Sequence, residues 1–269
     1  LWRRTIAAPI LFVWERTMNY DELLNISTEI GYRLLESGGE IYRVEESIQR
    51  IFEAYGIFTA EVFVIPSCII VTVCDEDGHS LTKIRRIRGL GMDLEKVVQF
   101  NALCRRICRE RPEFQEVHRE IRRIDQCTGY TFWQQLFAFA LISFSFTLFF
   151  GGDLTDACFA IFCGIGVKLV LHNMSRFEAN SFFTNIIASG TAAVIALFFV
   201  RIGLAHNSDK MIIGTLMNLV PGIAITNVMR DIIAGDLIAG LVKLTEALLV
   251  ATAIALGAGM AITLSQIFF

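Results

Sequence analysis

A proline-glycine pair interrupts a long apolar stretch near the end of the sequence. Residues 214–246 read GTLMNLVPGIAITNVMRDIIAGDLIAGLVKLTE. Pro221 lacks a backbone N–H and its ring clashes with the preceding helical turn, while Gly222 adds backbone freedom. Backbone groups freed at membrane depth are tolerated only where protein or a water-filled cavity surrounds them. The pattern is therefore typical of a solute site at a broken transporter helix, and a simple helix kink is the competing interpretation.

Uncharged polar residues lie on both sides of this pair. We interpret Asn218, Pro221, Gly222, Thr226 and Asn227 as a candidate substrate-binding site. If a helix restarts after Gly222, its free amides and the positive end of its dipole would favour a carboxylate. Each polar side chain alone could instead form a hydrogen bond to a neighbouring helix.

Charged residues follow the break at positions where a membrane helix would end and another begin. Such residues mark ion or substrate pathways, or structural ion pairs. Asp231 and Asp236 are candidates for carrying coupling protons, because a partly desolvated carboxylate can exchange protons near neutral pH. An interfacial turn with solvated charges, in which Asp236 caps the next helix, is the alternative. The full set of coupling or pathway candidates is Arg230, Asp231, Asp236, Lys243, Glu246 and Asp156.

Charge is shared unevenly along the 269 residues. Residues 1–128 hold 18 of the 24 Lys and Arg and 20 of the 27 Asp and Glu, which leaves 13 charged residues for the rest of the chain. The sequence therefore predicts a soluble domain over 18–128 and a lipid-embedded domain over 129–269. Residues 1–17 contain an apolar run without a small-residue cleavage site, so we expect a leader or upstream extension of unknown role.

The soluble domain has the pattern of a small α+β fold. Apolar residues three and four apart predict one helix from an N-cap at Asp21 and a second from Glu40. Strand-like runs follow at 60–65, 68–73 and 80–87, with a turn at Asp75–Gly78. Helical spacing returns over 94–107 and 114–124.

Five stretches of membrane-spanning length follow. They lie near 130–150, 154–172, 181–202, 210–229 and 237–268, and about 20 residues cross a hydrocarbon core of about 30 Å. We therefore predict an α-helical integral membrane protein, with a small cytosolic α+β domain followed by a five-helix transmembrane bundle. Ala251, Ala255 and Gly259 are expected to let the last helix pack closely. Seven arginines over 105–123 place the first domain in the cytoplasm by the positive-inside tendency.

Several functional classes lack their usual sequence signals. The seven cysteines form no Cys-x-x-Cys pair and the four histidines are scattered, so we expect no metal site. No nucleophile elbow and no phosphate-binding glycine loop is present, so we expect neither an enzyme nor a cofactor. A net charge of −3 gives no pull toward nucleic acid. The basic segment 83–88 could contact membrane lipid headgroups, or form a solvated strand face.

Four sequence blocks, in order, resemble the threonine/serine exporter family. They are ESGGEIYRVEESI (36–48), EVFVIPSCIIVTV (61–73), IRRIRGLGMDLEKVVQFNALCRRI (84–107) and GTLMNLVPGIAITNVMRDIIAGDLIAG (214–240). The resemblance runs from about Asp21 to Ala261. It implies a multi-pass protein of the bacterial inner membrane that exports small amino acids or carboxylates, such as threonine, serine or succinate, using the proton-motive force.

The resemblance also implies partners and a role for the first domain. The chain is similar to the short form of the family, in which a separate small membrane subunit supplies the remaining helices, so we expect a hetero-oligomer, with a homo-oligomer as the alternative. Glu40, Tyr42, Arg43 and Glu45 are expected to gate or dock onto the membrane domain. A membrane-anchored metabolite sensor without transport activity is the alternative function.

Overall fold

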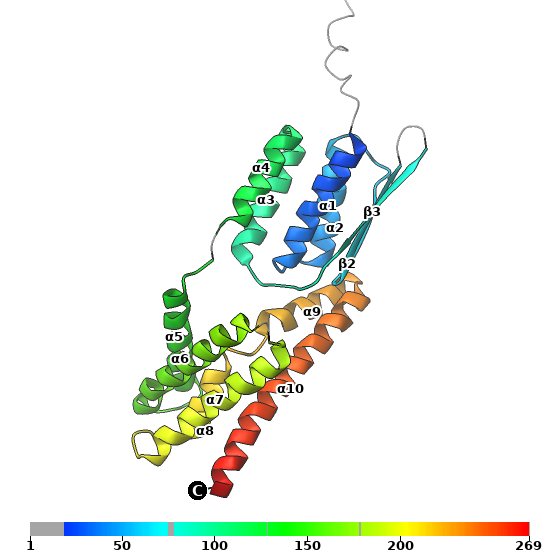
Figure 1. Ribbon diagram of the computed structural model, residues 1–269. Helices are drawn as coiled ribbons and strands as arrows, with labels where there is room; N and C mark the ends of the chain where they lie inside the picture. The colour runs from blue at the N-terminus through cyan, green and yellow to red at the C-terminus, as the bar shows by residue number, and fades with distance from the viewer. Residues whose placement is uncertain (1–18, 75–77, 128, 178, 269) are drawn as a thin grey trace, which may run out of the picture. The chain divides into compact units, whose positions relative to one another are not determined.

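The computed structural model describes residues 19–74, 78–127, 129–177 and 179–268 (Figure 1). The chain forms two compact units that divide after Cys127, next to the boundary expected from the charge distribution. The expected leader over 1–17 and most of the expected turn at 75–78 lie outside the described residues. Each unit has its own secondary structure and is described separately.

The N-terminal unit combines four helices with one sheet. Its elements are α1 (Tyr20–Glu36), α2 (Ile41–Ala54), β1 (Glu61–Ile65), β2 (Cys68–Cys74), β3 (Ser80–Arg86), α3 (Leu94–Glu110) and α4 (Phe114–Asp125). The strands pair antiparallel in the order β1-β2-β3. Ile30, Phe52, Ile69 and Phe100 are fully buried in its core. The α+β pattern predicted from the spacing of apolar residues is confirmed.

The first helix starts two residues earlier than the predicted N-cap implies. The side chain of Asn19 accepts a hydrogen bond of 3.1 Å from the backbone N–H of Glu22, so Asn19 is the N-cap. Asp21 lies inside the first turn, where a carboxylate interacts favourably with the helix dipole. The prediction of Asp21 as the cap was therefore wrong, because Asn and Asp have similar capping preferences and the sequence offers both.

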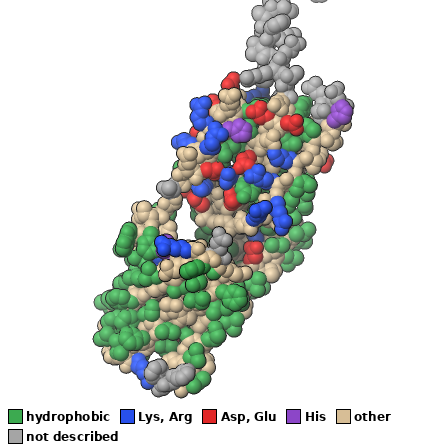
Figure 2. Space-filling model, viewed as in Figure 1, with side chains coloured by type: hydrophobic (Ala, Val, Ile, Leu, Met, Phe, Trp, Pro, Cys, Tyr) green, Lys and Arg blue, Asp and Glu red, His purple; other side chains and the backbone are tan. Residues whose placement is uncertain are grey.

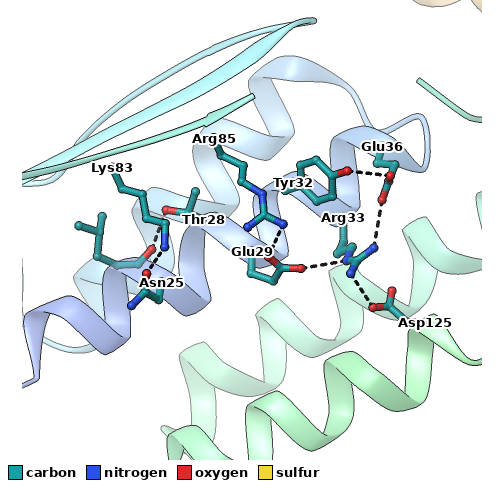
Figure 3. Close-up of polar contacts among 10 residues, drawn as sticks. Asn25, Thr28, Glu29, Tyr32, Arg33, Glu36, Lys83, Arg85 and Asp125 are labelled. Carbon is teal, nitrogen blue, oxygen red and sulfur yellow. Dashed lines mark hydrogen bonds and ion pairs between the residues drawn. The ribbon is translucent and has the colours of Figure 1, made fainter. Parts of the chain in front are cut away.

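A charge network ties α1 to β3 and α4 (Figure 3). The carboxylate of Glu29 forms ion pairs with Arg33 at 3.0 Å and with Arg85 of β3 at 2.8 Å. Arg33 also reaches Asp125 of α4 at 3.0 Å. The guanidinium of Arg85 lies 4.5 Å from the centre of the Tyr32 ring. These partly buried contacts fix the sheet and the last helix on the same central helix.

The C-terminal unit is entirely helical in its described part. Its elements are α5 (Phe132–Phe149), α6 (Leu154–Arg176), α7 (Ser181–Arg201), α8 (Ser208–Leu216), α9 (Gly222–Ala234) and α10 (Leu237–Phe268). Four of these, α5, α6, α7 and α10, are long and apolar enough to cross a membrane. On the face shown in Figure 2, hydrophobic side chains cover this unit and charged ones gather over the N-terminal unit.

The predicted five-helix bundle therefore needs correction at its fourth member. The stretch expected to span near 210–229 consists of two shorter helices, α8 and α9, separated by residues 217–221. Four continuous helices of spanning length remain in the described part of the chain. The interruption itself was predicted, because Pro221 cannot continue a regular helix.

Helices α7 and α10 pack closely through small residues, but not through the ones expected. A Cβ added at Gly257 would lie 2.1 Å from the carbonyl oxygen of Ile186. Ala251, Ala255 and Gly259 are instead exposed in this single chain. Small residues recur on more than one face of α10, so spacing alone selected the wrong face for packing against α7.

Candidate functional site

The break in the fourth hydrophobic segment is a short turn between two helices. After α8 ends, the amides of Leu219 and Val220 both donate to the carbonyl oxygen of Leu216, at 2.8 and 3.2 Å. Pro221 precedes the first residue of α9, with φ −79° and ψ 59°. The interruption therefore exposes backbone groups that a continuous helix would satisfy internally.

Asn218 connects this turn to α5. Its amide nitrogen Nδ2 lies 2.9 Å from Ser143 Oγ, 3.0 Å from the carbonyl oxygen of Thr215 and 3.4 Å from that of Phe139. Asn218 Oδ1 and Thr215 Oγ1 are buried and have no hydrogen-bond partner among the described residues. A buried polar atom without a partner costs about 1–3 kcal/mol, so each of these oxygens keeps an unused acceptor position.

Glycines allow α5, α6 and α8 to approach closely at this cluster. A Cβ added at Gly214 would lie 2.5 Å from Thr147 Oγ1, and one added at Gly164 would lie 2.4 Å from Ser143 Oγ. Ser143 and Thr147 are fully buried and donate to carbonyl oxygens of their own helix, at 2.9 and 2.7 Å. Both are polar residues, four positions apart, inside a mostly apolar span, and that spacing could have indicated them from the sequence. They were not among the predicted site residues.

Thr226 and Asn227 do not join the Asn218 cluster. The hydroxyl of Thr226 donates to the carbonyl oxygen of Gly222 at 3.1 Å, on the exposed side of α9. Asn227 is half-buried on the same helix. In the described part of the chain no hydrogen bond links either residue to Asn218. The structure therefore brings together only part of the predicted substrate-binding set.

The first turn of α9 leaves backbone donors unused. The amide of Gly222 donates to Val220 at 2.9 Å and that of Ile225 donates to Pro221 at 3.0 Å. The amides of Ile223 and Ala224 between them have no acceptor among the described residues. Free amides at the positive end of a helix suit an anionic group.

A buried ion pair joins α9 to α10. Lys243 Nζ lies 2.7 Å from Asp231 Oδ2, and the Asp231 side chain is fully buried while that of Lys243 is 12% exposed. Asp231 Oδ1 is also buried but has no partner in the described part of the chain. Sequence spacing placed both residues near the break but did not pair them. Their contact depends on how the two helices fold back on each other.

A tight turn brings these helices together. Gly235 ends α9 with φ +99°, a conformation that favours glycine. The backbone N–H of Asp236 donates to the carbonyl oxygen of Asp231 at 2.9 Å. A Cβ added at Gly240 of α10 would lie 2.5 Å from Ile232 Cγ1 of α9. The segment AGDLIAG is therefore a helical hairpin turn whose glycines permit close packing.

The remaining charged candidates near the hairpin are more accessible. Asp236 is half-buried in the turn, whereas Arg230 on α9 and Glu246 on α10 are exposed. Asp231 and Lys243, two of the predicted coupling residues, form an ion pair with each other. The buried pair is consequently the strongest candidate for a charge that changes during a transport cycle.

Asp156 has a structural role at the start of α6. Its Oδ1 accepts from the amides of His206 at 2.7 Å and Asn207 at 3.2 Å. Its Oδ2 accepts from Asn207 Nδ2 at 2.8 Å and from the amide of Asp153 at 3.1 Å. Both carboxylate oxygens are therefore occupied in capping α6 and holding the segment before α8.

The predicted gating residues make local contacts in the N-terminal unit. Arg43 Nε lies 2.8 Å from Glu40 Oε2. Tyr42 accepts a hydrogen bond of 3.1 Å from the same nitrogen. Glu45 Oε1 accepts from the amide of Val64 at 2.8 Å and so ties α2 to β1. These contacts account for the four residues within their own unit.

The chain has four helices of membrane-spanning length in its described part, and buried polar residues lie at a broken segment between them. This combination defines a multi-pass membrane protein with the features of a transporter. A family model described as “Putative threonine/serine exporter” matches residues 25–265. The chain therefore belongs to the threonine/serine exporter family.

A curated relative supports this assignment. The “Probable threonine/serine exporter” of Mycobacterium tuberculosis is 20% identical over 239 residues, which cover 88% of this chain and 45% of the relative. The chain thus spans about half the length of that relative. No solved structure matches the chain.

Proposed function

We propose that this chain is one subunit of an exporter of small carboxylate-bearing metabolites, driven by the proton-motive force. The observation that carries the proposal is the broken fourth segment, where Asn218 Oδ1 and Asp231 Oδ1 are buried without partners. A structural kink alone would leave no reason for unsatisfied oxygens on both halves of the segment. The names of the family and of the relative support the substrate class.

In this proposal the solute binds at the break. Its carboxylate accepts hydrogen bonds from the free amides of Ile223 and Ala224 at the start of α9. A donor group on the solute, the ammonium in a threonine-like substrate, satisfies Asn218 Oδ1 and Thr215 Oγ1. A dicarboxylate such as succinate lacks that donor, so the pair of Asn218 and Thr215 favours an amino acid.

The ion pair of Asp231 and Lys243 provides a reversible link between α9 and α10. Protonation of Asp231 would remove the carboxylate charge that holds Lys243 and so weaken the attachment of the two helices. A proton gradient could then drive alternation between two packings of the hairpin. The N-terminal unit, with its many arginines before α5, would lie in the cytoplasm.

A second membrane subunit would complete the transporter. As part of this proposal, a separate small membrane subunit of the same family joins this chain. Exposed apolar residues on α5 and α10, among them Phe137 and Leu248, are available to lipid or to such a partner. Many transporters are built from two repeats with the site at their interface, and a second unit would supply the counterpart of this one.

The decisive experiment is solute flux in vesicles. The chain, reconstituted with its candidate partner, is expected to show net flux of labelled threonine or serine that is driven by a proton gradient and that a proton ionophore reduces. Asp231→Asn and Pro221→Ala should lower the flux at least tenfold at equal protein levels, whereas Thr226→Ala, on the exposed side of α9, should leave it within twofold. Flux at the parental rate in the first two variants would refute the proposed site. Ligand binding without flux would instead favour the membrane-anchored sensor.

A further inference from the structure

A groove runs between α2 and α3 in the N-terminal unit, and none of its lining residues belongs to the proposed transport site. It has a volume of about 920 Å³, within the range of pockets that bind small molecules. The thiol of Cys108 on α3 lies 3.5 Å from the carbonyl oxygen of Arg50 on α2, which fixes the two walls against each other. Ser47 and the buried Cys104 also line the groove.

The walls of this groove are positively charged. Four arginines and two glutamates line it, namely Arg43, Arg50, Arg105, Arg109, Glu46 and Glu53. Both helices contribute arginines, so guanidinium groups border the hollow from two sides. An excess of positive charge in a concave site concentrates anions from solution.

The arginines on α3 are free to bind a ligand. Arg105 and Arg109 are one helical turn apart, and neither has an ion pair or side-chain hydrogen bond among the described residues. On the opposite wall Arg50 pairs with Glu46 at 2.6 Å, with both side chains more than half exposed. An exposed pair of this kind contributes at most about 1 kcal/mol, so an incoming anion can compete for Arg50.

The groove also offers a surface for the organic part of a ligand. The half-buried ring of Tyr42 lies at the end where α2 begins, and Ala54 lies near the other end. Arginine is the residue best suited to bind phosphate oxygens in pairs, and aromatic rings stack on planar groups. A solvated helix face would place its arginines on a convex surface, whereas these border a hollow.

We propose that the groove between α2 and α3 binds a phosphate-bearing anion, held by Arg105 and Arg109 with Arg50 facing them. The phosphate can belong to a soluble metabolite or to the headgroup of a phospholipid. Either source would make the N-terminal unit a regulatory binding site in addition to the transport site. The proposal does not depend on export activity and is tested by binding.

The first test measures binding of inorganic pyrophosphate to the full chain in neutral detergent by calorimetry. We expect saturable binding that weakens at least tenfold in Arg105→Gln/Arg109→Gln. The matched control is Arg119→Gln/Arg122→Gln on α4, which removes the same charge from exposed positions that line a separate, smaller hollow of about 400 Å³ and should bind within twofold of the parent. Equal weakening in both double variants would show diffuse charge attraction and overturn the proposal.

A second test uses Cys108 as a reporter within the groove. Pyrophosphate is expected to slow alkylation of Cys108 at least threefold and to leave the exposed Cys127 unaffected. In nanodiscs of phosphatidylglycerol, compared with phosphatidylcholine, the same protection without added pyrophosphate would identify a lipid headgroup as the source. Absence of both saturable pyrophosphate binding and lipid-dependent protection would overturn the proposal.

The Arg105→Lys/Arg109→Lys variant tests whether weaker binding could result from misfolding. It keeps the charge and the helix but loses the paired hydrogen bonds of guanidinium groups. We expect an unchanged unfolding temperature with binding weakened three- to tenfold. Parental affinity in this variant and in Arg105→Gln/Arg109→Gln would exclude the arginines as ligands of the phosphate.

Discussion

Lys243 Nζ on α10 lies 2.7 Å from Oδ2 of Asp231 on α9, and the Asp231 side chain is completely buried. The pair closes a helical hairpin directly after the proline-glycine break. Removing one member of a buried pair leaves an uncompensated charge, whereas removing both does not. Comparing single and double variants of this pair therefore separates an effect on folding stability from an effect on transport.

We expect Lys243→Met to destabilise the chain by about 3–5 kcal/mol, because Asp231 would remain buried without its partner. The double variant Asp231→Asn/Lys243→Met should regain most of this stability without regaining flux. Thermal unfolding in detergent and vesicle flux would be measured side by side. Restored flux in the double variant would mean that the pair has only a structural role.

Asn218→Ala is expected to reduce solute flux at least tenfold while the protein stays folded. The substitution removes the contacts to α5 and one of the two unpartnered oxygens near the break. Asn185→Ala is the control, because Asn185 is a buried asparagine of α7 whose Nδ2 bonds to Ser181 of its own helix at 2.9 Å. Similar flux in the two variants would contradict a binding role for Asn218.

Gly214→Ala should destabilise the membrane unit by about 1–3 kcal/mol, as expected for an overpacked contact. Its new Cβ would lie 2.5 Å from the backbone nitrogen of Thr147, which cannot move aside alone. Gly259→Ala meets no atom within 4 Å and should be neutral or slightly stabilising. Unfolding temperatures of the two variants would be compared in the same detergent.

Asp156→Ala is expected to lower stability by about 2–4 kcal/mol, since four donors lose a charged acceptor. Asp156→Asn keeps some of these acceptors and should lose less. If Asp156 acts only as a cap, flux per folded molecule should stay near the parental value in both variants. A large loss of flux in a stable Asp156→Asn protein would show that Asp156 takes part in the transport pathway.

The thiol of Cys104 gives a pH-dependent prediction in the N-terminal unit. Burial raises the pKa of Cys104 from 9.0 to about 12. The unfolded chain therefore loses this proton first as the pH rises, so folding stability should fall between about pH 9 and pH 12. Urea unfolding of the parent and of Cys104→Ala across this range would measure the difference. An equal alkaline loss in both would assign the effect to other groups.

Local chemistry was sufficient to predict much of this fold. The apolar spacing gave the four helices and three strands of the N-terminal unit, and Pro221 gave the interruption after α8. Periodicity and the geometry of proline act within a few residues of the chain, so they can be recognised without knowing what packs nearby.

The candidate site was predicted only in part. Asn218, Asp231 and Lys243 were selected because polar residues in apolar stretches are costly unless they have partners. The partners themselves, Ser143 for Asn218 and the pairing of Lys243 with Asp231, were not predicted. Thr226 and Asp156 are also polar residues in apolar stretches. The structure shows instead that Thr226 bonds within α9 and that Asp156 caps the start of α6.

The sequence by itself determined where the helices break and which residues carry charge into the membrane unit, because those properties belong to individual residues and their neighbours. Only the tertiary structure decided which face of α10 packs on α7, that Ser143 meets Asn218, and that α2 and α3 enclose a basic groove. Each of these depends on contacts between segments far apart in the chain. Such contacts are set by how whole helices pack, which no local spacing records.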